Sequence, residues 1–135
     1  SHLMTGKLEG LIQRLADHEL YVARYYLERG RTKAAIWRLE YVVREYPRAR
    51  RDAEVLLLLG QVYLKQGEPK EARDAFRRLV IEHPDDYRVE QAKVYLDYIA
   101  STFGDLPPPA PLPPRKGPGA GRSQAADEND LLPPE

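Results

Sequence analysis

The chain of 135 residues contains no cysteine, which excludes disulfide bonds, cysteine metal ligands and thiol catalysis. It has no excess of charge either, because 21 lysines and arginines balance 21 aspartates and glutamates. A neutral chain lacks the basic footprint that is typical of nucleic-acid binding. No apolar run approaches the roughly 20 residues that span a bilayer, and the longest, residues 55–59, suits a buried helix face. These absences favour one folded domain that contacts neither nucleic acid nor membrane.

Proline and aromatic residues are unevenly distributed along the chain. Residues 105–135 hold nine of the twelve prolines and no aromatic residue. Such a segment buries too little apolar surface to offset its ordering entropy, so we expect a disordered Pro-rich tail, with polyproline II character around residues 107–114. The first four residues, Ser1 to Met4, resemble the remnant of a cloning tag, whose attachment would have removed any signal peptide or lipidation site. The folded domain is therefore expected over residues 8–104.

The chain partly repeats itself after 37 residues. Eight identical residues recur at this spacing, including small, aromatic and turn-forming types. The pairs are Tyr26 and Tyr63, Leu27 and Leu64, Gly30 and Gly67, Lys33 and Lys70, Ala35 and Ala72, Val43 and Val80, Glu45 and Glu82, and Pro47 and Pro84. This pattern is typical of helix-pair repeats, which bury their apolar faces only by stacking on neighbours. A binding scaffold is thus favoured over an active site.

Helical periodicity within residues 8–104 predicts five helices and no strand, an all-α fold. Glycines end the first and third helices, prolines end the second and fourth, and Thr32 and Asp52 are expected to cap the second and third. The predicted spans are 8–30, 32–46, 52–67, 69–83 and 87–103. They group into repeats at about 8–47 and 50–84, followed by a cap helix with a polar outer face. Two repeats fall short of the usual three, so the long first helix or a missing upstream repeat is expected to compensate.

The repeat resembles the tetratricopeptide pattern. The second copy carries the eight signature positions as Leu56, Leu59, Gly60, Tyr63, Ala72, Phe76, Leu79 and Pro84. The first copy has Glu19, Val22, Ala23, Tyr26, Ala35, Leu39, Val42 and Pro47 at these positions. Glu19 departs from the large apolar residue that is usual there. Each copy is three residues longer than the standard unit, with the extra length in the turn at residues 48–52.

A narrower resemblance lies in the stretches His18 to Gly30 and Arg38 to Pro47, with their Val22-Ala23 and Arg29-Gly30 pairs. Over residues 14–84 the chain is similar to the C-terminal repeats of the BamD (YfiO) outer-membrane assembly lipoproteins. The resemblance implies a periplasm-facing scaffold that docks on BamA periplasmic domains and helps β-barrel proteins insert. The family's upstream repeats and lipidated cysteine are absent, so the chain would correspond to the C-terminal half of such a protein.

The resemblance places Arg38 at the basic position that faces the BamA partner, with Glu40 beside it. A guanidinium in that place makes a bidentate contact with a partner carboxylate. The alternative is an exposed helix arginine that pairs with a local glutamate and adds little.

The first helix of each tetratricopeptide pair lines a concave surface, which here offers further candidate partner-binding residues. They are Leu20, Arg24, Leu57, Gln61 and Leu64. The Lys and Asn set that clamps a peptide carboxylate in some family members is missing, so an apolar or helical ligand fits better. The alternative is that these leucines pack on the neighbouring repeat or the cap.

For three other patterns we prefer explanations that involve no specific function. The basic groups Arg48, Arg50, Arg51 and Arg73, Arg77, Arg78 either steer an acidic partner or are solvated faces. Residues 111–114 with Lys116 resemble a PxxP ligand, but a match is nearly automatic in so proline-dense a tail, which favours a spacer. His18, His83 and Ser101 lack partners for metal binding or catalysis, so no enzyme, metal or cofactor is expected.

The sequence therefore predicts a protein-binding scaffold of the BamD type. Other cell-envelope tetratricopeptide proteins, of the Tol-Pal or pilus type, are the near alternative, and a cytosolic peptide-binding adaptor with a proline-rich recruitment tail is a more distant one. The oligomeric state stays open.

Overall fold

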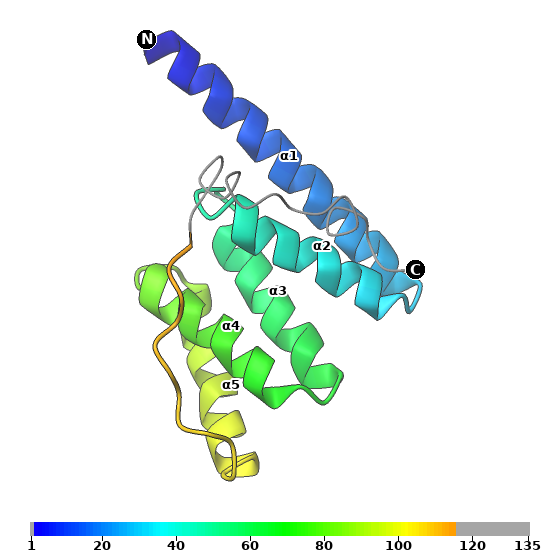
Figure 1. Cartoon of the computed structure of the whole chain (residues 1–135), viewed down its shortest axis with the longest axis vertical. Coiled ribbons are helices and arrows are strands. Elements are labelled where there is room, and N and C mark those ends of the chain that lie inside the picture. The colour runs from blue at the N-terminus through cyan, green and yellow to red at the C-terminus, as the bar shows by residue number, and fades with distance from the viewer. Residues whose placement is uncertain (1, 116–135) are drawn as a thin grey trace. The chain divides into compact units, whose positions relative to one another are not determined.

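The computed structural model of the chain describes residues 2–115, with side chains from Met4 onward. These residues contain five α-helices and no strand (Figure 1). The helices are α1 (His2–Glu28), α2 (Thr32–Glu45), α3 (Asp52–Lys65), α4 (Pro69–Glu82) and α5 (Arg88–Thr102). The described residues form two compact units, residues 2–52 with Arg115 and residues 53–114. The predicted all-α fold of two helix pairs and a fifth, capping helix is confirmed.

The 37-residue repeat is visible in the backbone. The bounds of α4 lie 37 residues after those of α2. After α1, Gly30 takes a φ of 72° and the Arg31 N–H donates to the Tyr26 carbonyl at 2.9 Å; after α3, Gly67 takes a φ of 75° and the Glu68 N–H donates to Tyr63 at 2.9 Å. Both helices thus end in a Schellman turn, whose left-handed residue is glycine because a Cβ is disfavoured there. Repeated sequence produces repeated turns.

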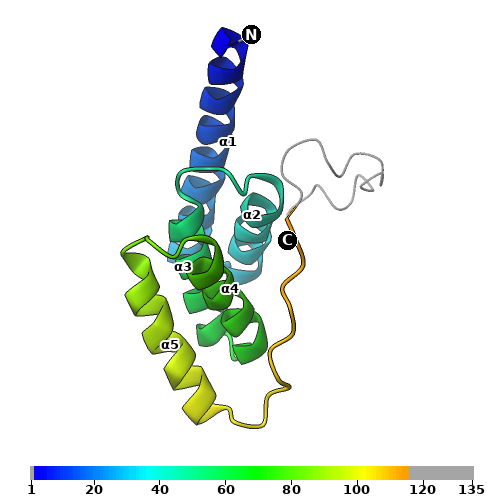
Figure 2. The same ribbon diagram turned by 90° about the vertical axis from the view of Figure 1, so that its left-hand side faces the viewer.

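The first unit is a hairpin of α1 and α2. The α1 helix has 27 residues and α2 has 14, and the N-terminal part of α1 projects beyond its partner (Figures 1 and 2). The buried apolar residues of this unit lie in the paired part and the following turn: Ala16, Leu20, Ala23, Ala34, Ala35, Leu39, Val42, Val43 and Ala49. Apolar burial drives the pairing of the two helices.

The second unit contains most of α3 together with α4 and α5. Gly60 of α3 faces the ring of Phe76 in α4 so closely that a Cβ on the glycine would collide with it. The same ring stacks on Tyr95 of α5, with centroids 4.7 Å apart and planes 3° from parallel. Phe76 is fully buried and therefore links all three helices of this unit.

Several helix starts differ from the prediction. Thr32 and Asp52 were expected as N-caps but are the first residues of α2 and α3, and α5 begins one residue late, at Arg88. The N-cap position of α2 belongs to Arg31, whose side chain makes no capping hydrogen bond. The Schellman turn explains this, because its last residue, Arg31, leads directly into the next helix. At the start of the chain, residues 2–7 extend α1 beyond the predicted span.

Residues 107–115 have no helix or strand and follow α4 within the second unit up to Pro114 (Figure 2). Arginines of α4 donate hydrogen bonds to carbonyls of this segment. Composition alone did not indicate these contacts. Lys116 and the rest of the predicted tail lie outside the described residues.

Candidate protein-binding surfaces

Arg38 of α2 pairs with a residue of α1, the other helix of the hairpin. Its Nη1 donates to both carboxylate oxygens of Glu19 in α1, at 3.1 and 2.9 Å. The two side chains are only 21% and 15% exposed. This pair explains why Glu19 stands where the repeat pattern has a large apolar residue: the carboxylate joins the two helices through a charged hydrogen bond instead of an apolar contact. Arg38 thus matches the alternative of a paired arginine, although it is half-buried and not exposed.

An aromatic row follows the same helix and was not singled out in the sequence. Trp37 and Tyr41 stack with centroids 5.5 Å apart, and Tyr41 meets Tyr46 edge to face at 5.9 Å. The pKa of Tyr46 is raised from 10.0 to about 12. The main cause is burial, followed by the neighbouring Tyr41 and the carboxylates of Glu19 and Glu45. The phenol of Tyr46 therefore stays neutral well into the alkaline range. A spacing of four to five residues on one helix was the available signal.

The remaining predicted residues of the first unit differ in exposure. Leu20 is 1% exposed and belongs to the core, which favours the packing alternative for this leucine. Glu40 is half-buried and Arg24 is exposed. Near Arg24 on α1, Tyr21 is 71% exposed, and Tyr25 is 44% exposed and lies under the guanidinium of Arg29 at 3.4 Å. Arg24 therefore belongs to an open surface of arginine and tyrosine side chains.

The predicted residues of the second unit are partly covered. Leu57, Gln61 and Leu64 are each half-buried on α3. The amide of Gln61 donates to the Tyr95 hydroxyl at 3.1 Å, so it connects α3 to α5. The predicted concave set is divided between the two units, with Leu20 and Arg24 in the first and Leu57, Gln61 and Leu64 in the second.

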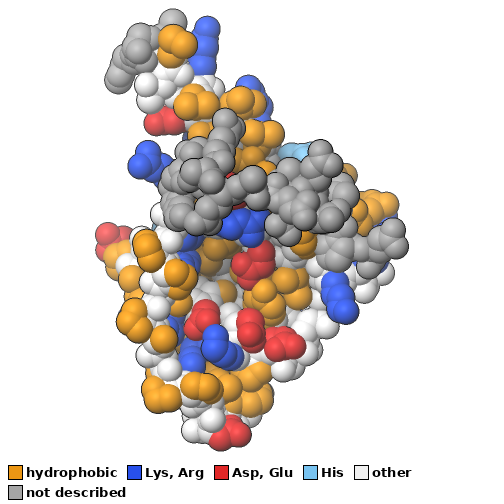
Figure 3. All heavy atoms as spheres, viewed as in Figure 1, with side chains coloured by type: hydrophobic (Ala, Val, Ile, Leu, Met, Phe, Trp, Pro, Cys, Tyr) orange, Lys and Arg blue, Asp and Glu red, His pale blue; other side chains and the backbone are white. Residues whose placement is uncertain are grey.

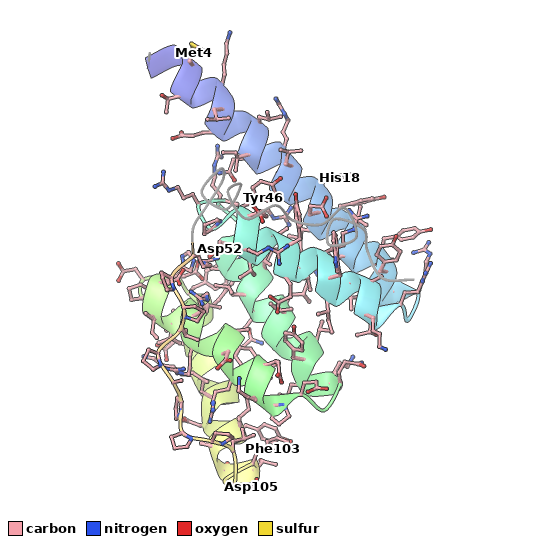
Figure 4. All side chains as sticks on the ribbon, viewed as in Figure 1. Met4, His18, Tyr46, Asp52, Phe103 and Asp105 are labelled. Carbon is pink, nitrogen blue, oxygen red and sulfur yellow. The ribbon has the colours of Figure 1, made fainter. Side chains whose placement is uncertain are left out.

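The projecting part of α1 exposes a stripe of large apolar side chains. Met4 is 70% exposed, Leu8 58%, Leu11 45% and Leu15 42%. Spacings of four, three and four residues place them on one helix face. Figure 4 shows Met4 near the free end of the helix, and Figure 3 shows apolar side chains along this projecting part. The sequence identified the periodicity of this stripe but not its exposure.

The outer face of α5 also carries apolar groups. Val94 is 68% exposed and Tyr98 51%, and Tyr87 just before the helix is 79% exposed. The predicted polar residues are present on the same helix, where Glu90, Lys93 and Asp97 are exposed. The outer face of α5 is therefore polar with two large apolar side chains among its exposed residues.

The two basic groups are both engaged in contacts. In the turn before α3, the Arg50 N–H donates to Gln13 at 2.8 Å and the Arg51 guanidinium lies 3.6 Å from Asp17. The arginines of α4 bind the carbonyls of residues 107–113. The side chains of the turn group remain exposed, whereas those of the α4 group are engaged by the segment that covers them.

Comparison with known proteins assigns the family. Residues 4–79, more than half of the chain, match the YfiO family, described as an outer membrane lipoprotein. The chain is 35% identical over 80 residues to the outer membrane protein assembly factor BamD of Neisseria meningitidis serogroup A. It is 34% identical over 80 residues to the proteins of the same name from N. meningitidis serogroup B and N. gonorrhoeae. Each match covers 59% of this chain and 30% of the relative.

The chain thus spans about a third of the length of these relatives. No solved structure matches it. Within residues 2–115, no helix has both the length and the apolar character needed to cross a bilayer. The matched region contains both helix pairs almost completely, with the Arg38–Glu19 pair and the stripe on α1 inside it. The chain therefore belongs to the YfiO family of outer membrane lipoproteins.

Proposed function

We propose that the chain is a protein–protein interaction scaffold of outer-membrane β-barrel protein assembly, acting at the periplasmic face of the outer membrane. Membership of the YfiO family and the similarity to BamD assembly factors support this role. The partners are BamA-like periplasmic domains or unfolded segments of outer-membrane proteins. The scaffold acts by presenting surfaces to these partners and carries out no chemistry. The same similarity favours this role over a cytosolic adaptor.

The observation that carries the proposal is the apolar stripe on α1, of which Leu8, Leu11 and Leu15 lie beyond the tag-like first four residues. An ordered helix face of this kind is unusual on a protein that has no partner. Burial of one such side chain stabilises a complex by about 1–2 kcal/mol. The stripe therefore suits the apolar face of a partner helix, which is recognised through side chains at these spacings.

Arg24 and Glu40 both reach solvent and form a second, polar candidate contact of the first unit, apart from the stripe. Charged residues of this kind orient a partner and speed its association. Arg38 acts through Glu19 by holding α2 against α1. Leu57 and Leu64 of the second unit offer a smaller apolar contact of the same kind.

The proposal is tested by binding of the full chain to the periplasmic domains of a BamA-type protein, measured by calorimetry. We expect Leu8→Glu with Leu11→Glu to weaken binding at least about tenfold, because two buried leucines are replaced by charges. Val94→Glu is the control, since it places a glutamate on an exposed apolar site of α5, where the side chain is 68% exposed compared with 58% for Leu8 and 45% for Leu11.

Two results would count against the proposal. If the unmodified chain shows no binding to these domains, the assembly role loses its partner. If Val94→Glu weakens binding and the double substitution on α1 does not, the partner binds α5 and not the stripe on α1. Circular dichroism of each variant reports whether the helices are retained.

A further inference from the structure

One face of α4 carries three arginines, Arg73, Arg77 and Arg78, which we call the arginine face. It is covered by residues 106–114, which we call the proline segment (Figure 2). Each arginine donates one hydrogen bond to a backbone carbonyl: Arg73 Nη2 to Pro107 at 2.7 Å, Arg77 Nη1 to Ala110 at 2.8 Å, and Arg78 Nη2 to Pro113 at 2.8 Å. The order of the acceptors follows the order of the donors. The proline segment therefore runs in the same direction as α4.

The three acceptors are spaced by three residues. A polyproline II helix has three residues per turn, so carbonyls at 107, 110 and 113 point to the same side, about 9 Å apart along the axis. Six of the nine residues of the proline segment are prolines, which fix φ near the polyproline II value. The three carbonyls that the arginine face binds thus follow the period of a polyproline II helix.

The side chains of the proline segment follow the same period. Leu106 and Leu112 are half-buried, whereas Pro107, Pro108 and Ala110 are exposed. Leu106 and Leu112 are six residues apart, which is two turns of a polyproline II helix, so they share a side. The contact therefore has a polar edge of carbonyls and an apolar edge of leucines.

The chemistry of the donors suits this backbone. A polyproline II helix has no internal hydrogen bonds, so its carbonyls, that of Ala110 included, accept from outside. Charged donors make stronger hydrogen bonds than neutral ones. Arg78 is also fixed in place, because its Nη1 donates to Glu82 at 2.6 Å while Nη2 reaches Pro113, and the residue is 9% exposed.

We propose that the arginine face of α4 is a binding site for proline-rich segments in the polyproline II conformation, and that residues 106–114 occupy it as a built-in ligand. A proline-rich segment of another protein binds there by displacing the built-in one. The leucines at 106 and 112 define the preferred ligand, with large apolar side chains six residues apart. This site is separate from the surface on α1 and does not depend on the assembly role.

The test uses the full chain and a fluorescent peptide with the sequence of residues 106–115, with binding measured by anisotropy. In one variant, Pro107, Pro108, Pro109 and Pro111 are all changed to glycine. Glycine loses much more conformational entropy on ordering than proline does, so the built-in ligand is weakened while α4 is unchanged. We expect this glycine variant to bind the peptide at least about tenfold more tightly than the unmodified chain, whose own segment competes at a high effective concentration.

Arginine substitutions made in the glycine variant test the donors. We expect Arg77→Ala to weaken peptide binding by about tenfold or more, as loss of one charged hydrogen bond predicts, and Arg77→Lys to fall between. Arg14→Ala, at an exposed arginine of α1, is the matched control and leaves binding unchanged. A peptide with glycine at every proline position retains the carbonyls but loses the preformed helix, so it binds more weakly.

The proposal is overturned if the glycine variant binds the peptide no better than the unmodified chain does. It is equally overturned if Arg77→Ala and Arg14→Ala bind the peptide alike. Arg73→Ala repeats the test at a second, half-buried donor, so misfolding of one variant does not decide the outcome. Helix content of every variant is checked by circular dichroism.

Discussion

At the scale of single residues, the two copies of the repeat solve the same packing problem with different sizes. Ala23 and Leu39 of the first unit lie 37 residues before Gly60 and Phe76 of the second. All four residues are buried. In the second unit a larger ring requires a smaller neighbour, since a Cβ at Gly60 would meet Phe76. The glycine is therefore needed for space and not for backbone conformation.

This relation predicts the outcome of a double-mutant cycle. Gly60→Ala is expected to destabilise the chain by about 1–3 kcal/mol through overpacking, even though alanine favours a helix. Phe76→Leu creates a cavity and loses the stack on Tyr95. The double variant introduces the alanine and leucine pair of the first copy. Its loss in free energy of unfolding should therefore be smaller than the sum of the two single losses by about 1 kcal/mol or more. Urea unfolding of the four proteins measures the coupling.

The matched control for this cycle lies in the first copy. Ala23→Gly with Leu39→Phe installs the second copy's pair in the first unit, and the two changes should be less harmful together than separately. Additive losses in both cycles would show that the two positions do not compete for space. Additivity only in the first unit would restrict the argument to α3 and α4.

At the scale of elements, the ends of helices were predictable and the partners of helices were not. Gly30 and Gly67 end their helices because they adopt a positive φ, and Pro84 ends its helix because it has no N–H to donate. Both properties belong to the residue itself and are visible in the sequence. The Arg38–Glu19 pair joins residues 19 apart on two helices, and nothing in the local sequence selects it over other glutamates. The exposure of Leu8 and Leu11 was hidden for a similar reason, since periodicity reports an apolar face and not what covers it.

The pair between α1 and α2 allows its structural role to be separated from partner binding. Arg38→Glu or Glu19→Arg alone places like charges together in a half-buried site, and each should destabilise the hairpin by about 2 kcal/mol. The swap that carries both changes restores an ion pair and should recover at least half of the loss. Thermal unfolding measures stability, and calorimetry with the partner domains measures binding.

The swap also distinguishes the two roles of Arg38. If Arg38 only holds the hairpin, binding to the partner recovers together with stability in the swapped chain. Recovery of stability without recovery of binding would mean that the guanidinium itself contacts the partner, as the family resemblance implied. The control is Lys33→Glu in α2, which makes the same change of charge at an exposed site of the same hairpin.

At the scale of the whole molecule, a contact between residues 63 apart closes the first unit. Arg115 donates to both oxygens of Asp52, at 2.7 Å each, and to the Val43 carbonyl at 3.0 Å. The Asp52 side chain is fully buried and that of Arg115 is 8% exposed. Figure 4 shows Asp52 at the start of α3. The composition of residues 105–135 predicted no such role for this stretch, because composition describes average burial and not a single well-placed arginine.

The closing contact predicts a large effect of one substitution far along the chain. Arg115→Ala leaves the carboxylate of Asp52 buried without its main counter-ion, and we expect a loss of about 3–5 kcal/mol. Adding Asp52→Asn removes the buried charge, so the double variant should be more stable than Arg115→Ala alone. A surface pair would behave differently: it would contribute less than about 1 kcal/mol and weaken with salt. Urea unfolding at low and high salt therefore separates the two cases, and a small, salt-sensitive effect of Arg115→Ala would mean that the end of the described chain is not fixed to the first unit.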